Sequence, residues 1–540
     1  MNRDRANNID WIRLLENSDA IKTEYKNVKS IVNGNISKLK SVDGDDFVEL
    51  LSDSVMAISS FENMLNILYF KTNSKTVNTI LKKIKKKDFL QIVYDDQTIK
   101  DKLKNIAKNS SIDVKCFAND FIRSCLLYEK NCSATIAKKN SKKNNNINNN
   151  INNNINNDML IEFEKNIKSI ATKHGKNTFY DLISSKDADF LKMLLKQVVK
   201  ISSTKINVDE DVLLISVKKY SLKNSINCLF KMIEDIFDIY FQENKNNIGF
   251  GQSYDVCNNE NAKVMSTVCI DIYDNTGLNI DPFFVEINNS THNKNGNFFI
   301  LGKYGDNVSY IDIIKIFRQM GILIHRSLSR FRYANVYDDN KVIFYEYFFE
   351  QILSEEVIIK HYFSKIIDKN DVLSIITSIK KNNILRIKHD CVLTIFDAYL
   401  QNSSEYYDNY NAVVAKYNSI QSIYYGDCNK TDYVPKHVVT RMILDAGLTY
   451  LSIENYLMVY NLHNFVKRNK IHMNVVLKSI FSETTKSLKD SIDAFMENNL
   501  CKSAVNVNSA TSSVQEKFIS KPKINMERLY DNIDCYTENY

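Results

Sequence analysis

Residues that break helices are scarce in this sequence. Its 540 residues include only three prolines and twelve glycines. Both residues disfavour helix interiors, and a many-turned β architecture needs them at its turns. Their scarcity therefore excludes such an architecture and predicts a mainly α protein with long helices.

The sequence also lacks disulfide and membrane signals. Its ten cysteines are irregularly spaced and include no CxxC pair, which is typical of free thiols in a reducing compartment. The N-terminus has no apolar stretch of the signal-peptide kind, and no later apolar run is long enough to cross a bilayer. We therefore expect a cytoplasmic protein with no membrane partner.

Positive charge is only slightly in excess, with a formal net charge of +7. Charge alone therefore does not imply a nucleic-acid partner. The densest basic run consists of Lys82, Lys83, Lys85, Lys86 and Lys87. A solvated helix end is the simpler interpretation of this run, and contact with phosphates is the alternative. Phosphate-loop, dinucleotide and elbow-serine motifs are absent.

Changes in composition divide the chain into segments. Helical periodicity over residues 1–137 predicts an N-terminal helical region, and the Asn-rich tract 138–157 is expected to be a disordered loop. Helical patterns return over 158–500, interrupted at about 250–302 by short apolar runs that predict a small β-sheet. Residues 501–540 form a polar tail.

The most informative pattern lies within residues 308–362. Residues 318–325 read RQMGILIH and are followed by RSLSRFRY. This resembles the active-site helix of the thimet oligopeptidase, neurolysin and bacterial oligopeptidase family of zinc peptidases, which carries HEFGHALH, a leucine-serine-arginine run and an RY pair. Residues 219–241 and 269–277 resemble the helix and strand that precede it in that family. The resemblance covers about residues 160–480.

In that family the two histidines of HExxH hold a zinc ion, and the glutamate between them polarises the bound water. A glutamate from the next helix is the third ligand. Here Arg318 and Ile322 stand at the histidine positions, Gln319 at the catalytic glutamate and Tyr347 at the third ligand. The guanidinium also puts a fixed positive charge where a dication would sit. The resemblance therefore implies a degenerate site with no zinc, no other cofactor and no catalytic residue.

Four further residues are candidates for lining a channel. His325 matches a family histidine that is not a zinc ligand, and its simplest interpretation is a core histidine with a satisfied hydrogen bond. Glu346 lies one place from the third-ligand position, so a shifted register would restore one carboxylate, which alone is not a zinc site. Gln351 matches a glutamine of the ligand helix, and Tyr450 lies in a segment that resembles the family's tyrosine-rich substrate helix.

An aromatic cluster occupies the place of the family's ligand helix. Its members are Phe344, Tyr345, Tyr347, Phe348 and Phe349. Core packing and a new binding surface are the two interpretations, and core packing is favoured.

The resemblance implies a zincin-like oligopeptidase fold, in which two helical lobes flank a deep channel and one lobe carries a small sheet. It also implies a catalytically inactive homologue that binds a peptide or protein partner or has a structural role. A peptidase or other hydrolase that uses the same channel without a metal is one alternative. A nucleic-acid-associated protein that uses the basic helix ends is another.

Overall fold

A computed structural model describes most of the chain outside residues 122–216 and 509–540. The described ranges are 18–83, 96–109, 217–244, 251–259, 262–274, 279–288, 295–329, 339–402, 410–425, 431–444, 451–483 and 488–508, with single residues at 93, 114, 117, 118, 121 and 449. The predicted Asn-rich loop at 138–157 lies outside them.

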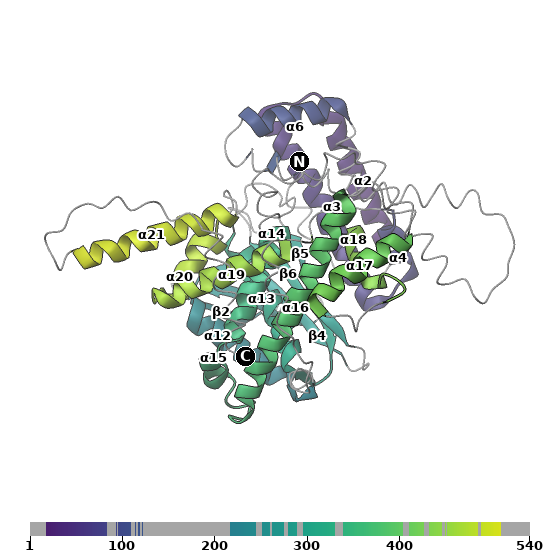
Figure 1. The fold of residues 1–540 in the computed structure, drawn as a ribbon. Coiled ribbons are helices and arrows are strands. Elements are labelled where there is room, and N and C mark those ends of the chain that lie inside the picture. The colour runs from purple at the N-terminus through teal and green to yellow at the C-terminus, as the bar shows by residue number, and fades with distance from the viewer. Residues whose placement is uncertain are drawn as a thin grey trace. The chain divides into compact units, whose positions relative to one another are not determined.

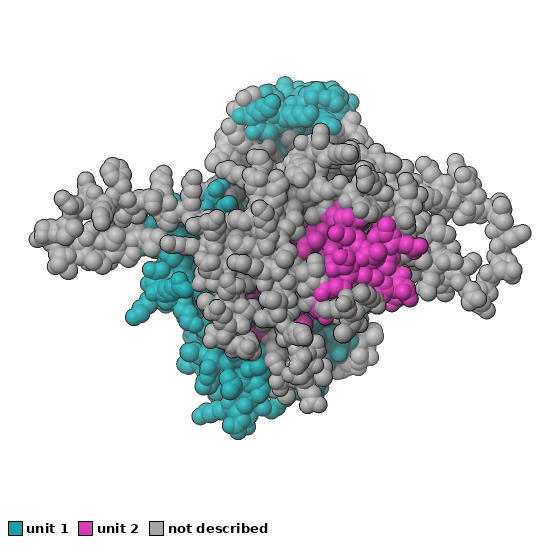
Figure 2. Space-filling view, viewed as in Figure 1, with its two compact units in different colours: residues 1–125, 213–378, 458–523 teal, residues 126–212, 379–457, 524–540 magenta. Residues whose placement is uncertain are grey.

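The chain divides into two compact units (Figure 2). Unit 1 comprises residues 1–125, 213–378 and 458–523, and unit 2 comprises residues 126–212, 379–457 and 524–540. Helices dominate the described residues of both units, and unit 1 also carries a small sheet (Figure 1). The prediction of a mainly α protein with a small sheet is confirmed. No helix among the described residues is long and apolar enough to cross a membrane.

The sheet of unit 1 has five strands in the order β2-β3-β4-β6-β5. Their bounds are Ile239–Glu243 for β2, Gln252–Asn258 for β3, Val264–Tyr273 for β4, Ile280–Asn288 for β5 and Gly296–Tyr304 for β6. Only β4 and β6 pair in parallel. Both central strands are buried along most of their length, as expected for strands covered on both faces. The sheet begins before the predicted 250–302 region, because β2 lies in a stretch where a helix was predicted, and it ends at Tyr304.

The N-terminal helices of unit 1 are α2 (Ser18–Leu39), α3 (Gly44–Thr72), α4 (Lys75–Leu81) and α6 (Gln97–Asn109). Helix α3 packs on the edge strand β5 across more than two hundred residues of sequence. Ser60 Oγ donates to the Ile287 carbonyl at 2.6 Å, and Asn63 Nδ2 donates to the Glu286 carbonyl at 2.7 Å. These side chains satisfy main-chain acceptors that a bare sheet edge would expose.

The remaining helices of unit 1 follow or flank the sheet. They are α12 (Leu222–Phe237), α13 (Tyr310–Leu328), α14 (Asp339–Leu353), α15 (Glu356–Tyr362), α20 (Met473–Val476), the π-helix η3 (Leu477–Phe481) and α21 (Leu488–Asn508). Because α21 continues to Asn508, the predicted tail is helical over residues 501–508. Helices α16 (Asp371–Asn402) and α19 (Leu451–Arg468) each run from one unit into the other, and α17 (Tyr410–Tyr425) and α18 (Lys436–Leu444) belong to unit 2.

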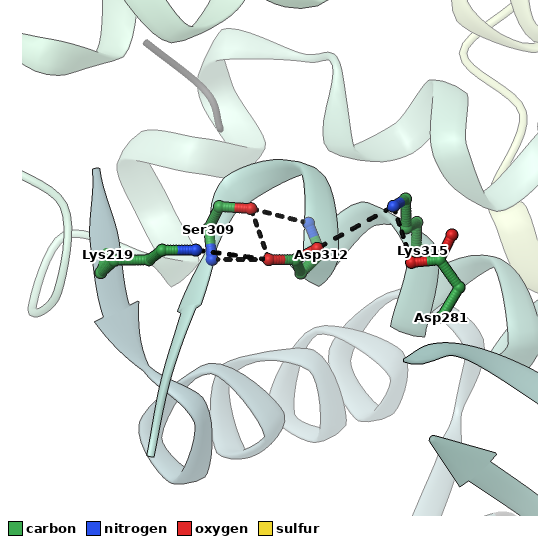
Figure 3. Close-up of polar contacts among 5 residues, drawn as sticks. All are labelled: Lys219, Asp281, Ser309, Asp312 and Lys315. Atoms are coloured by element: carbon green, nitrogen blue, oxygen red, sulfur yellow. Dashed lines mark hydrogen bonds and ion pairs between the residues drawn. The ribbon is translucent and has the colours of Figure 1, made fainter. Parts of the chain in front are cut away.

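Helix α13 begins with a capping box at the end of strand β7 (Asn307–Ser309), which pairs with β1 (Lys219–Ser221). Ser309 Oγ accepts from the Asp312 amide, and Asp312 Oδ2 accepts from the Ser309 amide at 3.0 Å. Lys219 from β1 approaches Asp312, and Lys315 pairs with Asp281 of β5 at 2.8 Å (Figure 3). A carboxylate in the first turn also complements the helix dipole. The start of α13 is thus fixed against the two-stranded sheet of β1 and β7 and against β5 of the five-stranded sheet.

Helices α13 and α14 form an antiparallel pair. The Tyr310 hydroxyl, at the start of α13, donates to the Leu353 carbonyl at the end of α14 at 3.0 Å. Farther along α13, the helices approach each other closely at Gly321. A Cβ atom there would lie 2.6 Å from the Tyr345 carbonyl oxygen and 2.9 Å from the Phe349 ring. Glycine is therefore required for this spacing, which accounts for the glycine in RQMGILIH.

We expect Gly321→Ala to destabilise the protein by about 1–3 kcal/mol, because the added methyl group must push the two helices apart. Gly34→Ala is the matched control. Gly34 is also inside a helix, but a Cβ there meets nothing within 4 Å, so alanine should be neutral or stabilising by up to about 1 kcal/mol. Urea unfolding of both variants measures the difference, and equal stabilities would contradict the close contact.

Candidate functional site

Polar side chains from α13 and α14 meet at the RQMGILIH segment, residues 318–325. Arg318 Nη2 donates to Glu346 Oε2 at 3.2 Å, and Gln319 Nε2 donates to Glu346 Oε1 at 3.2 Å. Arg318 Nε forms an ion pair with Glu350 Oε2 at 3.6 Å, and the guanidinium carbon lies 5.3 Å from the centre of the Tyr347 ring. These five residues are called the Arg318 cluster below.

The cluster is largely shielded from water. The side chains of Arg318 and Glu346 are 23% and 20% exposed, and that of Glu350 is 6% exposed. Charges in such a setting interact more strongly than charges on the surface. Removing one partner of a buried ion pair therefore destabilises the folded protein more than removing one partner of an exposed ion pair. The guanidinium is therefore a cation shared by both carboxylates.

The structure brings together three of the four residues at the predicted zinc-chemistry positions. Arg318 and Gln319 face α14, Tyr347 lies against the guanidinium, and Glu346 contacts both α13 side chains. Ile322 is 4% exposed, one turn farther along α13. Of the other candidates on these helices, Gln351 is half-buried. Tyr450 lies outside the described residues.

These residues do not fit a zinc ion. Arginine offers five donors and no acceptor, so it cannot be a ligand. Zinc sites in proteins use thiolate, imidazole and carboxylate donors, of which the cluster has only two carboxylates. Across the part of the chain that the structure describes, no three His, Cys, Asp or Glu side chains converge as a metal site would require. The donor set and the guanidinium argue together against a metal at this position.

His325 is a residue of the helical core. It is 1% exposed, its Nδ1 lies 2.7 Å from the Phe481 carbonyl oxygen, and its ring stacks on Tyr345 with centres 3.9 Å apart. Ser329 Oγ donates to the same carbonyl at 3.1 Å. Phe481 is the last residue of the π-helix, and a π-turn alters the ordinary helical hydrogen bonding. With so little exposure, His325 cannot line an open channel in this conformation.

The aromatic cluster of α14 is packed in the core. Its members are at most 7% exposed. The Phe349 ring stacks on Phe237 with centres 5.0 Å apart, and it lies 4.7 Å from the Phe317 ring. Core packing is therefore confirmed over the alternative of a new binding surface.

Sequence reasoning missed Glu350, the second carboxylate beside Arg318. Its signal was available: Glu346 and Glu350 are four residues apart and so share one face of a helix. It also missed a histidine pair in unit 2, where the rings of His389 on α16 and His437 on α18 lie 5.6 Å apart. No spacing rule within one helix would have found that pair. Of the predicted basic run, Lys82 and Lys83 are exposed, and Lys85, Lys86 and Lys87 lie outside the described residues.

Comparisons with known proteins establish no family. No family model matches the chain, and no curated protein matches it. Similar solved structures include one described as BsuCP (10% identity, 97% of this chain and 98% of that chain, TM-score 0.41) and metallocarboxypeptidase 1 of Trypanosoma cruzi (11%, 91% and 92%, 0.43). A third is described as CHT (10%, 91% and 92%, 0.41). Similarities of this size do not establish a common fold, and no description names the oligopeptidases that the sequence resembles.

The histidine pair predicts a pH dependence of stability. Burial lowers the pKa of His389, and the neighbouring His437 and Arg441 lower it further. A folded-state pKa below the unfolded value means that the unfolded chain binds the proton first as the pH falls. Stability from this group is therefore complete above the unfolded pKa of about 6.5 and is lost as the pH drops towards the folded value.

We expect His389→Gln to reduce the loss of stability between about pH 7.5 and pH 5 relative to the unmodified protein. Urea midpoints across this range, followed by a signal from unit 2, measure the difference. His361→Gln, at an exposed position in unit 1, serves as the control and should leave that unit 2 profile unchanged. Parallel pH profiles for the His389 variant and the unmodified protein would contradict the assignment.

Proposed function

We propose that this protein is a catalytically inactive homologue of an oligopeptidase-type zinc peptidase and that it binds a peptide or an unstructured protein segment. The single observation that carries the proposal is the ion pair between Arg318 and Glu346. It places a fixed cation and its counter-ion at the positions where the resembled motif has its first histidine and, one residue away, its third ligand.

The chemistry of the Arg318 cluster supports inactivity. Peptide hydrolysis by this class of enzyme needs a water whose pKa is lowered towards neutrality, together with a base to take its proton. A guanidinium stays protonated and cannot serve as the base. Glu346 has both carboxylate oxygens engaged by donors from α13. Glu346 is thus engaged within the cluster and is not a free base for activating water.

A binding role follows from how the proposed channel is made. In the resembled fold two helical lobes flank a deep channel, and packing rather than the metal shapes its walls. A chain that keeps this architecture keeps a surface suited to an extended peptide. We also place the protein in a reducing compartment such as the cytoplasm, which agrees with the free thiols of Cys228, Cys257, Cys269 and Cys391.

The proposal predicts peptide binding without turnover. Fluorescently labelled peptide libraries should bind the purified chain, chelator should leave the affinity unchanged, and mass spectrometry should recover the peptides intact. Elemental analysis should find no stoichiometric zinc. One tightly held zinc per chain with chelator-sensitive cleavage would overturn the proposal. Cleavage that chelator does not affect would favour the metal-free hydrolase, and the absence of peptide binding would leave only a structural role.

Restoring the motif tests the relationship directly. The triple variant Arg318→His, Gln319→Glu, Ile322→His recreates HExxH on α13 and leaves Glu346 facing it from α14. We expect the folded variant to take up about one zinc per chain, because histidines one turn apart point to the same side. Adding Glu346→Gln to this variant is the matched control and should weaken zinc uptake. A folded triple variant that binds no zinc would contradict the proposed relationship.

A further inference from the structure

The Arg318 cluster joins two helices through a single cation. The guanidinium approaches Glu346 through Nη2 and Glu350 through Nε, so two carboxylates from successive turns of α14 face one side chain of α13. The Tyr347 ring, from the same helix, contributes its electron-rich face. Gln319 donates to the Glu346 oxygen that Arg318 Nη2 does not contact. Every member from α14 therefore presents negative charge or π-density to the guanidinium.

Without the guanidinium, this arrangement is unfavourable. Glu346 and Glu350 are like charges at i and i+4, a spacing that destabilises a helix. Glu350 is 94% buried by side-chain area, and removing a cation that pairs with a buried carboxylate is costly. Lysine would be a poor replacement, because its ammonium is a point charge and cannot contact two carboxylates through a planar fork.

We propose that the space between Arg318, Glu346, Glu350 and Tyr347 is a cation site whose resident occupant is the chain's own guanidinium, and that this cation positions α14 against α13. Arg318 is accordingly a positioning residue. The proposal concerns the contact between two helices, so it stands whether or not the protein binds peptides. It also identifies the ligand that the site accepts when Arg318 is shortened, namely a free guanidinium ion.

Chemical rescue of Arg318→Ala tests the inference. We expect the variant to lose about 2–5 °C in Tm and to recover part of that loss in millimolar guanidinium or methylguanidinium, far below denaturing concentrations. Urea is the matched control compound, because it is planar and similar in size but uncharged, and it should not rescue. Gln319→Ala is the matched control variant: it removes one contact to Glu346 but leaves the cation in place, so guanidinium should not raise its Tm.

Two further variants separate charge from packing. Arg318→Met keeps most of the side-chain length without the charge, and it should be destabilised as Arg318→Ala is. Arg318→Met combined with Glu346→Gln and Glu350→Gln also removes the two negative charges that Arg318 offsets, and it should regain stability relative to Arg318→Met alone. If Arg318→Ala fails to fold, this comparison still shows whether Arg318 acts through its charge or through packing.

Three results would contradict the proposal that the charge of Arg318 positions α14 against α13. A stable Arg318→Met, or equal rescue of Arg318→Ala by urea and guanidinium, would show that Arg318 acts through packing alone. The same conclusion would follow if the variant that combines Arg318→Met with Glu346→Gln and Glu350→Gln were no more stable than Arg318→Met. Because none of these outcomes involves peptide binding or zinc, the inference and the proposed function fail independently.

Discussion

The close packing of α13 on α14 is the constraint on which the rest of unit 1 depends. Gly321 permits it, because a Cβ there would meet both the backbone and a ring of α14. The same contact brings Arg318 to its carboxylates and buries the aromatic side chains of α14 against α12 and η3. On its other side α13 reaches the sheet, where Arg326 pairs with Glu286 of β5 at 3.5 Å. A change in the spacing of the two helices would therefore affect the core and the polar cluster together.

Local patterns in the sequence predicted the mainly helical class with a small sheet, and they singled out several residues of the Arg318 cluster. Helical periodicity and short apolar runs are patterns among neighbouring residues, and the scarcity of proline permits long helices. Among the described residues, helices and a small sheet are present. The resemblance around RQMGILIH singled out Arg318, Gln319, Tyr347 and Glu346, all of which lie in the Arg318 cluster. The carboxylate of Glu346 accepts hydrogen bonds from both Arg318 and Gln319 of α13.

Contacts between distant segments could not be predicted in the same way. The hydrogen bonds from Ser60 and Asn63 of α3 to the carbonyls of β5 span more than two hundred residues, and no local spacing encodes them. The meeting of His389 and His437 likewise depends on how α16 and α18 pack. For His325 the sequence favoured a core position over a channel wall, and the residue is buried, but its partner Phe481 from a distant π-helix could not be predicted.

The positive charge of Arg318 and the neutral amide of Gln319 depend on each other electrostatically. With two carboxylates and one guanidinium, the cluster carries a formal charge of about −1, and the Gln319 amide donates to Glu346 Oε1 at 3.2 Å. A glutamate at position 319 would put a third carboxylate at that distance, and like charges so close repel by several kcal/mol at intermediate dielectric. A dication can compensate such a concentration of negative charge, whereas a monocation cannot. With a guanidinium in the cluster, an uncharged donor at position 319 is the electrostatically consistent choice, so Arg318 and Gln319 suit one another.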